Sequence, residues 1–216
     1  MRTPATFFVL LALSLPAAAQ APADAQNAQT RPASGFHAVE VANGIDLFLR
    51  QGPETVVVSA STVEGRDRIR TTVEKGVLRI WYDRPAVGWG FGWRTRQLRA
   101  YVSAPTLNAL SASGGSDIRV ESTPTAKVMG LDLSGGSDFQ GSVAVDSLAT
   151  SASGGSDVSI AGRAGRLSLQ VSGGSDVAAL GLAVETCAVS ASGGSDVQVT
   201  VNRELAIQAS GGSDVR

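Results

Sequence analysis

Six aspartates recur at nearly constant spacing in the second half of this sequence, and each closes a copy of the phrase Ser-Gly-Gly-Ser-Asp. The intervals between them are 21, 19, 19, 20 and 18 residues. A turn phrase repeated about every 20 residues indicates one coil of a solenoid, because a propeller blade needs about 40 residues. Stacked coils would place the carboxylates in one outward column at the inter-strand spacing of about 4.8 Å. The column comprises Asp117, Asp138, Asp157, Asp176, Asp196 and Asp214.

Such a column of carboxylates must be stabilised, because neighbours at this spacing repel each other by about 1 kcal/mol in a water-like dielectric. Each carboxylate could accept hydrogen bonds from backbone N–H groups of its own or the next Gly-Gly corner. The alternative is a row of Ca²⁺ ions, since hard cations prefer oxygen clusters. We favour the backbone and expect no bound metal, because calcium-binding β-rolls use a different, nine-residue Gly-Gly-x-Gly-x-Asp repeat. Serines beside the column, Ser113 and Ser116 in the first copy, add hydroxyls that could bind a glycan.

The residues that position this column alternate between small or apolar and polar, as in strands with one buried face. The residue after each aspartate is always apolar, and these residues would stack inside the coil. The sequence therefore predicts an all-β fold, a single-stranded parallel β-helix or β-solenoid with coils of about 20 residues. Cys187 has inward parity, which favours a buried structural thiol. The inward stack comprises Ile118, Phe139, Val158, Val177, Val197 and Val215.

A second candidate binding site is the glycine-rich segment 85–96, which carries Trp89, Phe91 and Trp93. One interpretation is an exposed loop whose aromatic and basic side chains stack on a sugar ring or insert into a partner surface. The other is a flap that covers the end or the flank of the solenoid. We favour the flap, because an exposed aromatic patch of this size is uncommon on a soluble monomer.

The first part of the chain indicates export. Residues 1–19 combine Arg2, a short apolar run and a small-residue cleavage site, which is typical of a secretory signal peptide. The apolar run is too short to span a bilayer, and we expect no transmembrane segment. We expect residues 20–34 to be a disordered linker, because Ala, Gln and Pro dominate them. One domain follows at 35–216, with irregular N-terminal coils at 35–104 and the Ser-Gly-Gly-Ser-Asp repeats at 105–216.

Charge and composition exclude several functions. Residues 36–104 carry ten Lys/Arg against seven Asp/Glu, a net charge of +3, and residues 105–216 carry six against eleven, a net charge of −5. The acidic half argues against nucleic acid as a partner. Catalysis needs a nucleophile and a base in a dry pocket, but no His, Lys or second carboxylate accompanies the repeated Ser and Asp. We therefore expect neither a cofactor nor a catalytic site.

Three features together resemble a bacterial family, the putative auto-transporter adhesin, head GIN domain. They are Gly44-Ile45-Asp46 after a short strand, the segment Leu98–Pro105 and the serial Ser-Gly-Gly-Ser-Asp copies. The resemblance covers roughly 35–216, although the signature tripeptide ends here in Asp46 rather than Asn. It implies an exported, right-handed parallel β-helix with an adhesin-like role.

The sequence thus predicts an exported, non-catalytic β-solenoid that binds or organises the cell envelope in the periplasm or at the cell surface. The alternative is a carbohydrate-active β-helix enzyme, which would show clustered carboxylates at one coil. A glycan or a cell-envelope protein is the expected partner, with the aspartate column and the aromatic segment as tentative contacts. The final coil exposes strand edges, which predicts a homo-oligomer through the C-terminal end.

Overall fold

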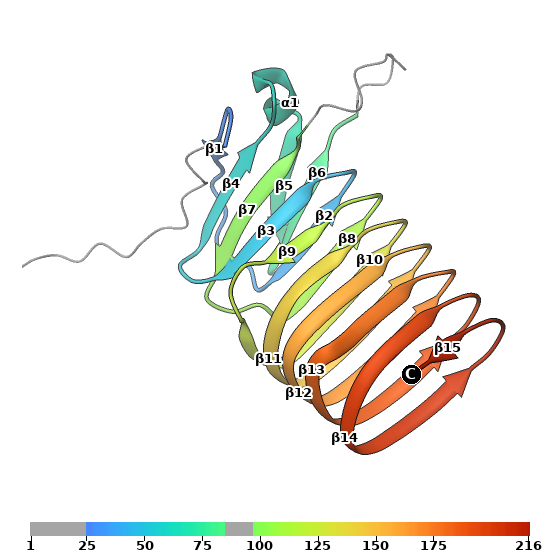
Figure 1. Cartoon of the computed structure of the whole chain (residues 1–216). Coiled ribbons are helices and arrows are strands. Elements are labelled where there is room, and N and C mark those ends of the chain that lie inside the picture. Colours follow the sequence, from blue (N-terminus) through green and yellow to red (C-terminus); the bar gives the residue numbers. More distant parts are fainter. Residues whose placement is uncertain (1–24, 85–96) are drawn as a thin grey trace, which may run out of the picture.

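The computed structural model describes residues 25–84 and 97–216, where the chain forms one 15-stranded sheet wound into a β-solenoid of about five turns (Figure 1). This confirms the fold class predicted from the repeat. One short helix, α1 (Val63–Asp67), interrupts the described strands, and it cannot cross a membrane. The strands are β1 (Gln29–Thr30), β2 (Ala38–Ala42), β3 (Asp46–Gln51), β4 (Thr55–Ser59), β5 (Ile69–Glu74), β6 (Val77–Tyr82), β7 (Arg99–Ala104), β8 (Ala109–Ser113), β9 (Ile118–Val120), β10 (Thr125–Ser134), β11 (Phe139–Ser153), β12 (Asp157–Ser172), β13 (Asp176–Ala191), β14 (Asp196–Ala209) and β15 (Asp214–Val215).

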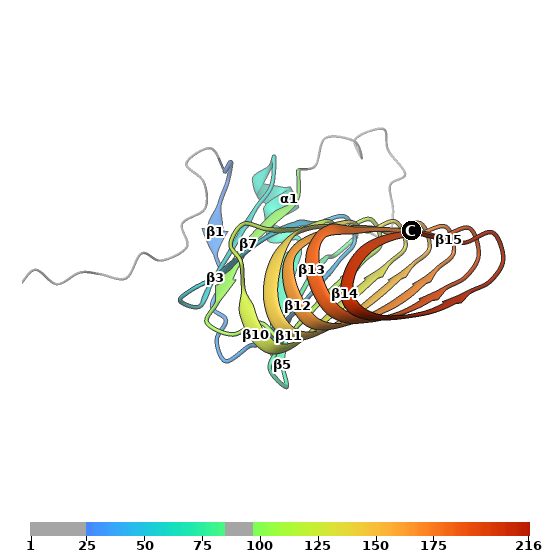
Figure 2. The same cartoon turned by 60° about the horizontal axis from the view of Figure 1, so that its bottom comes forward.

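Each repeat coil has one sharp corner at the Ser-Gly-Gly-Ser-Asp phrase and one smooth bend inside a long strand. β12, for example, starts after one corner and runs around the bend to the next corner. The strand halves on either side of the corners form two facing parallel layers, which give each coil its flattened outline in Figure 2. We call the half that precedes each corner the leading layer and the half that follows it the trailing layer. Consecutive coils are paired in register, so equivalent residues stack along the solenoid axis.

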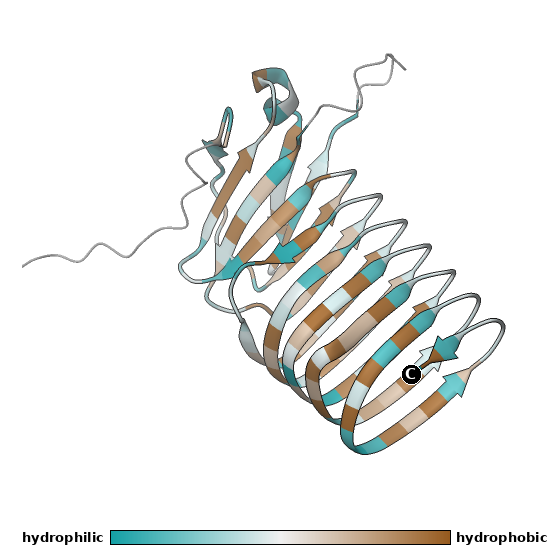
Figure 3. Ribbon diagram, viewed as in Figure 1, coloured by the Kyte–Doolittle hydropathy of each residue, from teal (hydrophilic) through white to brown (hydrophobic). Residues whose placement is uncertain are grey.

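The core lies between the two layers and consists of apolar side chains at alternate positions (Figure 3). The predicted inward stack is confirmed from Ile118 to Val197, where every member is at most 2% exposed. Cys187 also faces inward, and burial raises the pKa of its thiol to about 11. A thiol that stays protonated and buried is a packing residue, as predicted.

The N-terminal coils do not stack in chain order. β2 and β3 form one coil, and β8 and β9 pair with them on one side. The coil formed by β6 and β7 pairs with β2 and β3 on the other side, although it comes later in the chain than they do. Two antiparallel strands then finish this end, because β5 pairs with β6 and β4 pairs with β7. The irregular coils expected at 35–104 are therefore two parallel coils with an antiparallel cap.

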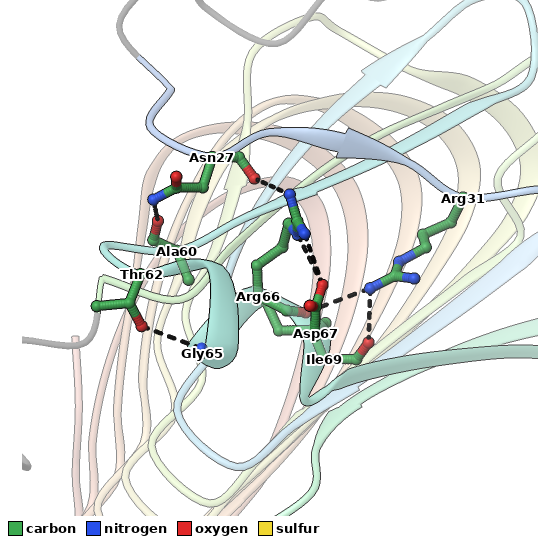
Figure 4. Close-up of polar contacts among 8 residues, drawn as sticks. All are labelled: Asn27, Arg31, Ala60, Thr62, Gly65, Arg66, Asp67 and Ile69. Carbon is green, nitrogen blue, oxygen red and sulfur yellow. Dashed lines mark hydrogen bonds and ion pairs between the residues drawn. The ribbon is translucent and has the colours of Figure 1, made fainter.

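Residues 25–34 are part of this cap, which corrects our expectation of a disordered linker at 20–34. β1 pairs with the edge of β4, and Asn27 accepts a hydrogen bond from Arg66 Nη1 (3.3 Å). Arg31 Nη2 donates to the carbonyl oxygens of Arg66 and Ile69, at 3.2 and 3.4 Å (Figure 4). Composition suggested disorder because it carries no information about these long-range backbone contacts.

The opposite end of the described solenoid is β14 with β15. Leu205 and Ile207 in the second half of β14 are each 46% exposed, whereas the equivalent Cys187 and Val189 in β13 are 5% and 3% exposed. The difference arises because the coil of β14 covers β13, while no further described coil lies over this half of β14. The last coil therefore presents apolar side chains beside a strand edge.

Candidate functional site

The corners set the direction of every outward side chain. Gly154 and Gly155 have φ values of 70° and 77°, a region that a residue with a Cβ enters at a cost of about 1–2 kcal/mol. A Cβ on Gly154 would also lie 3.2 Å from the backbone nitrogen of Gly135 in the preceding coil. Two consecutive left-handed residues reverse the chain sharply, so that Ser156 points inward and Asp157 points outward.

The second serine of each of the first five phrases lies inside the solenoid. Ser156 Oγ accepts a hydrogen bond from Ser137 N (3.2 Å) and donates one to the carbonyl oxygen of Ser153 (3.0 Å). Ser175 Oγ accepts from Ser156 N in the same way, at 3.0 Å. These serines form a buried ladder along the axis, in which hydrogen bonds join Ser116, Ser137, Ser156 and Ser175. They are Ser116, Ser137, Ser156, Ser175 and Ser195, all 0% exposed.

This ladder corrects our expectation that Ser116 and its equivalents present hydroxyls to a glycan. Ser116 Oγ is directed to the backbone, where it accepts the N–H groups of Gly44 and Ile45 at 3.0 and 3.2 Å. The alternation of side chains along a strand could have predicted this inward direction, because a residue next to an outward aspartate must face inward. Ser113, which is three residues earlier, is half-buried and faces outward.

The aspartates form the predicted outward column. Asp157, Asp176, Asp196 and Asp214 are paired in register, and their side chains are exposed. Asp138 Oδ1 accepts the backbone N–H of Asp157, and Asp176 Oδ1 accepts that of Asp196, both at 3.2 Å. Backbone N–H groups of the next coil therefore bind the carboxylates of Asp138 and Asp176, which is the kind of contact that we expected. The described residues contain no group of three or more His, Cys, Asp or Glu suited to a metal ion.

The column has a seventh member that the repeat phrase did not reveal. Asn43 and Gly44 have φ values of 69° and 80°, so they form the same kind of corner as the two glycines of a repeat. Ile45 then takes the inward serine position, and Asp46 lies beside Asp117 at the start of β3. The sequence contained this pattern, because two turn residues, Asn43 and Gly44, are followed by the inward Ile45 and then by Asp46, in the same order as in a repeat.

Two carboxyl groups at the N-terminal end of the column, Asp46 and Asp117, have raised pKa values. Burial, followed by repulsion from Asp117, raises the pKa of Asp46. Burial, followed by repulsion from Asp138, raises the pKa of Asp117. Arg119 lowers both pKa values, and Arg99 lowers that of Asp46, so cations only partly compensate the carboxylates. These two carboxyl groups therefore hold protons more strongly than isolated aspartates.

The outward positions of the leading layer form a flat polar surface. Two rows of side chains run along the axis on consecutive outward positions, and they are half-buried or exposed. Apart from Asp132 they are uncharged. One row holds Ser113, Ser134, Ser153, Ser172, Ser192 and Ser210, and the other holds Ser111, Asp132, Ser151, Gln170, Ser190 and Gln208.

The aromatic candidates belong to the segment 85–96. Trp89, Phe91 and Trp93 lie outside the described residues. Asp132 is on the flat leading layer, whereas Asp146 lies at the bend, where its carbonyl oxygen faces Gly165 of the next coil. These two carboxylates therefore do not form a shared acid–base pair.

Solved structures with the same architecture include a putative adhesin from Bacteroides fragilis, with a TM-score of 0.72 and 16% identity over 87% of this chain and 94% of that chain. A putative adhesin from Parabacteroides distasonis has a TM-score of 0.63 and 16% identity, covering 88% and 96% of the two chains. A putative lipid binding protein from Parabacteroides distasonis has a TM-score of 0.61 and 13% identity, covering 88% and 96%. At these identities the likeness shows a common fold.

The comparison with curated proteins finds no match to this chain. A family model, by contrast, matches nearly all of the domain that forms the solenoid. Its match extends over residues 35–216, which include Asp46, both N-terminal coils and every Ser-Gly-Gly-Ser-Asp corner. The chain therefore belongs to the family described as putative auto-transporter adhesin, head GIN domain.

Proposed function

We propose that this chain is an exported, non-catalytic β-solenoid module that binds a repetitive component of the cell envelope, in the periplasm or at the cell surface. The observation that carries the proposal is the in-register recurrence of the same polar side chains from coil to coil. A surface that repeats at the inter-strand spacing of about 4.8 Å can make many equal, weak contacts with a polymer. Such contacts add up when they act on one ligand.

A glycan is the favoured partner. The leading layer offers hydroxyl and amide groups that both donate and accept hydrogen bonds, which matches the hydroxyls of a neutral polysaccharide. The trailing layer adds the aspartate column, whose carboxylates accept hydrogen bonds. A cell-envelope protein is the competing class of partner, and adhesin-like names within the family are compatible with both.

The rival function is a carbohydrate-active enzyme, and one observation favours it. Asp46 and Asp117 are adjacent carboxyl groups with raised pKa values, and glycosidases use paired carboxyl groups. Their separation, however, is the spacing that stacked strands impose on every neighbouring pair of the column. The repeat thus explains the pair without catalysis. Release of reducing ends by the wild type, abolished in Asp117→Asn, would establish the enzyme instead.

Self-association through the last coil is part of the proposal. Leu205 and Ile207 lie beside the strand edge of β14, and both are partly exposed. A second copy that pairs with this edge would cover them and satisfy the edge N–H and C=O groups.

The proposal is tested by a binding screen of residues 20–216 against immobilised glycans and isolated cell-envelope fractions, with and without calcium. We expect calcium-independent binding to at least one polysaccharide. Binding to none of these materials, or binding only to envelope proteins, would overturn the glycan function.

A further inference from the structure

A groove of about 340 Å³ lies on the leading layer where it meets the N-terminal cap. β2, β5 and β6 form it, so it is at the end of the solenoid that holds the antiparallel strands. Neither the repeat phrase nor the aspartate column contributes to it. The side chains that define it are Trp81 and Ala42 on one side and Glu40, Thr72, Glu74 and Arg79 on the other.

Trp81 supplies an aromatic surface that remains partly exposed. Its register neighbours are Ala42 on β2, whose methyl group is too small to cover an indole ring, and Arg70 on β5, whose guanidinium is paired with Asp83. Phe48 provides a contrast on the trailing layer, since its ring stacks on Tyr101 with centroids 5.1 Å apart and lies 5.9 Å from Arg119 Cζ. Within 25–84 and 97–216, Trp81 makes no comparable ring or cation contact. The part of its indole that the described residues leave exposed can contact a ligand.

The polar side of the groove is a small charged network. Arg79 Nε lies 3.1 Å from Glu40 Oε2, and Arg79 Nη1 lies 3.9 Å from Glu74 Oε2. The three side chains are 51%, 44% and 66% exposed, so each keeps free hydrogen-bonding capacity. A guanidinium beside carboxylates offers donors and acceptors together, which suits a ligand with adjacent hydroxyl groups.

This combination separates the groove from two others. The groove around Ser159 and Leu180 has no aromatic or charged lining residue. The groove around Arg166 and Glu204 has charged groups but no aromatic ring. Binding sites for small polar ligands typically combine an apolar wall with a few convergent polar groups, and the Trp81 groove meets both conditions.

The groove borders the flat polar rows of the leading layer. Ala42 is paired with Ser113, which begins the row that runs through Ser134 and Ser153 toward the last coil. A ligand longer than one ring could therefore leave the groove and extend along the solenoid axis over these hydroxyls.

We infer that the Trp81 groove is a glycan subsite in which the indole stacks against the C–H face of a neutral pyranose ring while Glu40 and Arg79 hydrogen-bond its hydroxyls. The inference rests on the proposed glycan-binding function and assigns it a position. A neutral ring is specified because Arg79 already neutralises part of the charge of the two glutamates.

The test uses three soluble probes, namely cellohexaose, maltohexaose and N-acetylchitohexaose. In a Trp89→Phe, Trp93→Phe background, Trp81 is the sole tryptophan, and its fluorescence reports directly on the groove. We expect at least one probe to give a saturable blue shift. In the chain with native tryptophans, calorimetry should show at least a tenfold weaker affinity for Trp81→Ala and a smaller loss for Trp81→Phe.

Val63→Ala is the matched control, because it removes another exposed apolar side chain at the same end but outside the groove. Its affinity should equal that of the wild type. If none of the probes binds, or if a folded Trp81→Ala protein binds them as tightly as the wild type, the subsite is wrong. The envelope screen decides separately on the proposed function, which survives if polysaccharide binding persists in Trp81→Ala.

Discussion

Removal of one hydroxyl from the buried serine ladder should destabilise the solenoid far more than removal of a surface hydroxyl. Ser156→Ala is the informative change, because both hydrogen bonds of Ser156 Oγ are defined. The variant leaves Ser137 N–H without its acceptor and Ser153 C=O without one donor. Both groups lie at a corner whose serine is 0% exposed, so water cannot readily replace the lost partner.

The expected loss of stability follows mainly from the unpaired N–H group of Ser137. A buried donor left without a partner costs about 1–3 kcal/mol, and the alanine methyl group recovers little of it. For a domain of this size, each kcal/mol lowers the melting temperature by about 2–4 °C. A loss of about 2 kcal/mol therefore corresponds to a decrease of about 4–8 °C.

Two experiments measure this effect: thermal unfolding and urea unfolding, both monitored by circular dichroism. Ser159→Ala is the matched control, because Ser159 is an exposed serine of the same coil, and surface changes are usually within about 0.5 kcal/mol. Equal stability losses in Ser156→Ala and Ser159→Ala would show that the ladder does not hold the coils together.

The other predictions concern the corner, the column and the last coil. Gly154→Val should destabilise by about 2 kcal/mol or more in urea unfolding, because of its φ and its close backbone neighbour, and should exceed Asp157→Asn; a milder loss would refute the steric role of the corner. Millimolar Ca²⁺ should leave the melting temperature nearly unchanged, since a site filled at 100 times its dissociation constant would add about 2.7 kcal/mol; a rise of several degrees that Asp157→Asn abolishes would make the column a metal site. The raised pKa of Asp117 means that its folded-state carboxyl binds a proton more strongly, so stability falls as the pH rises from the unfolded-state pKa through the folded-state pKa. Asp117→Asn should therefore stabilise at pH 7, by up to about 1 kcal/mol at low salt, but not below pH 3, and an unchanged difference across this range would contradict the assignment. Leu205→Glu should shift the sedimentation of micromolar protein toward monomer, whereas a wild type that is already a strict monomer would refute pairing through the last coil.

The repeated part of the fold could be predicted because its sequence signals are local. A glycine pair with positive φ fixes each of the first four corners, and the last two keep one such glycine, Gly193 and Gly211. Strict alternation fixes which side chains enter the core. The same alternation also specified the buried serines. We assigned Ser116 to the surface because it flanks the aspartate column, although parity placed it on the inward face.

The N-terminal end could not be predicted to the same degree because its contacts are long-range. Chain order gives no signal that β6 and β7 lie outside β2 and β3. The Trp81 groove depends on that arrangement, since it needs β5, β6 and β2 side by side. Asp46 joins the column for the same reason, although its turn-like spacing was visible in the sequence.

The central claim is that a non-catalytic solenoid binds an envelope glycan, and co-sedimentation tests it most directly. A protein of residues 20–216 is mixed with insoluble cell-envelope material that is intact, protease-treated or oxidised with periodate, which cleaves vicinal diols. The account predicts binding to the intact and protease-treated material, loss of binding after periodate, and no release of reducing ends. Binding that survives periodate but is lost after protease treatment would contradict it, and so would reducing ends released in proportion to the protein added.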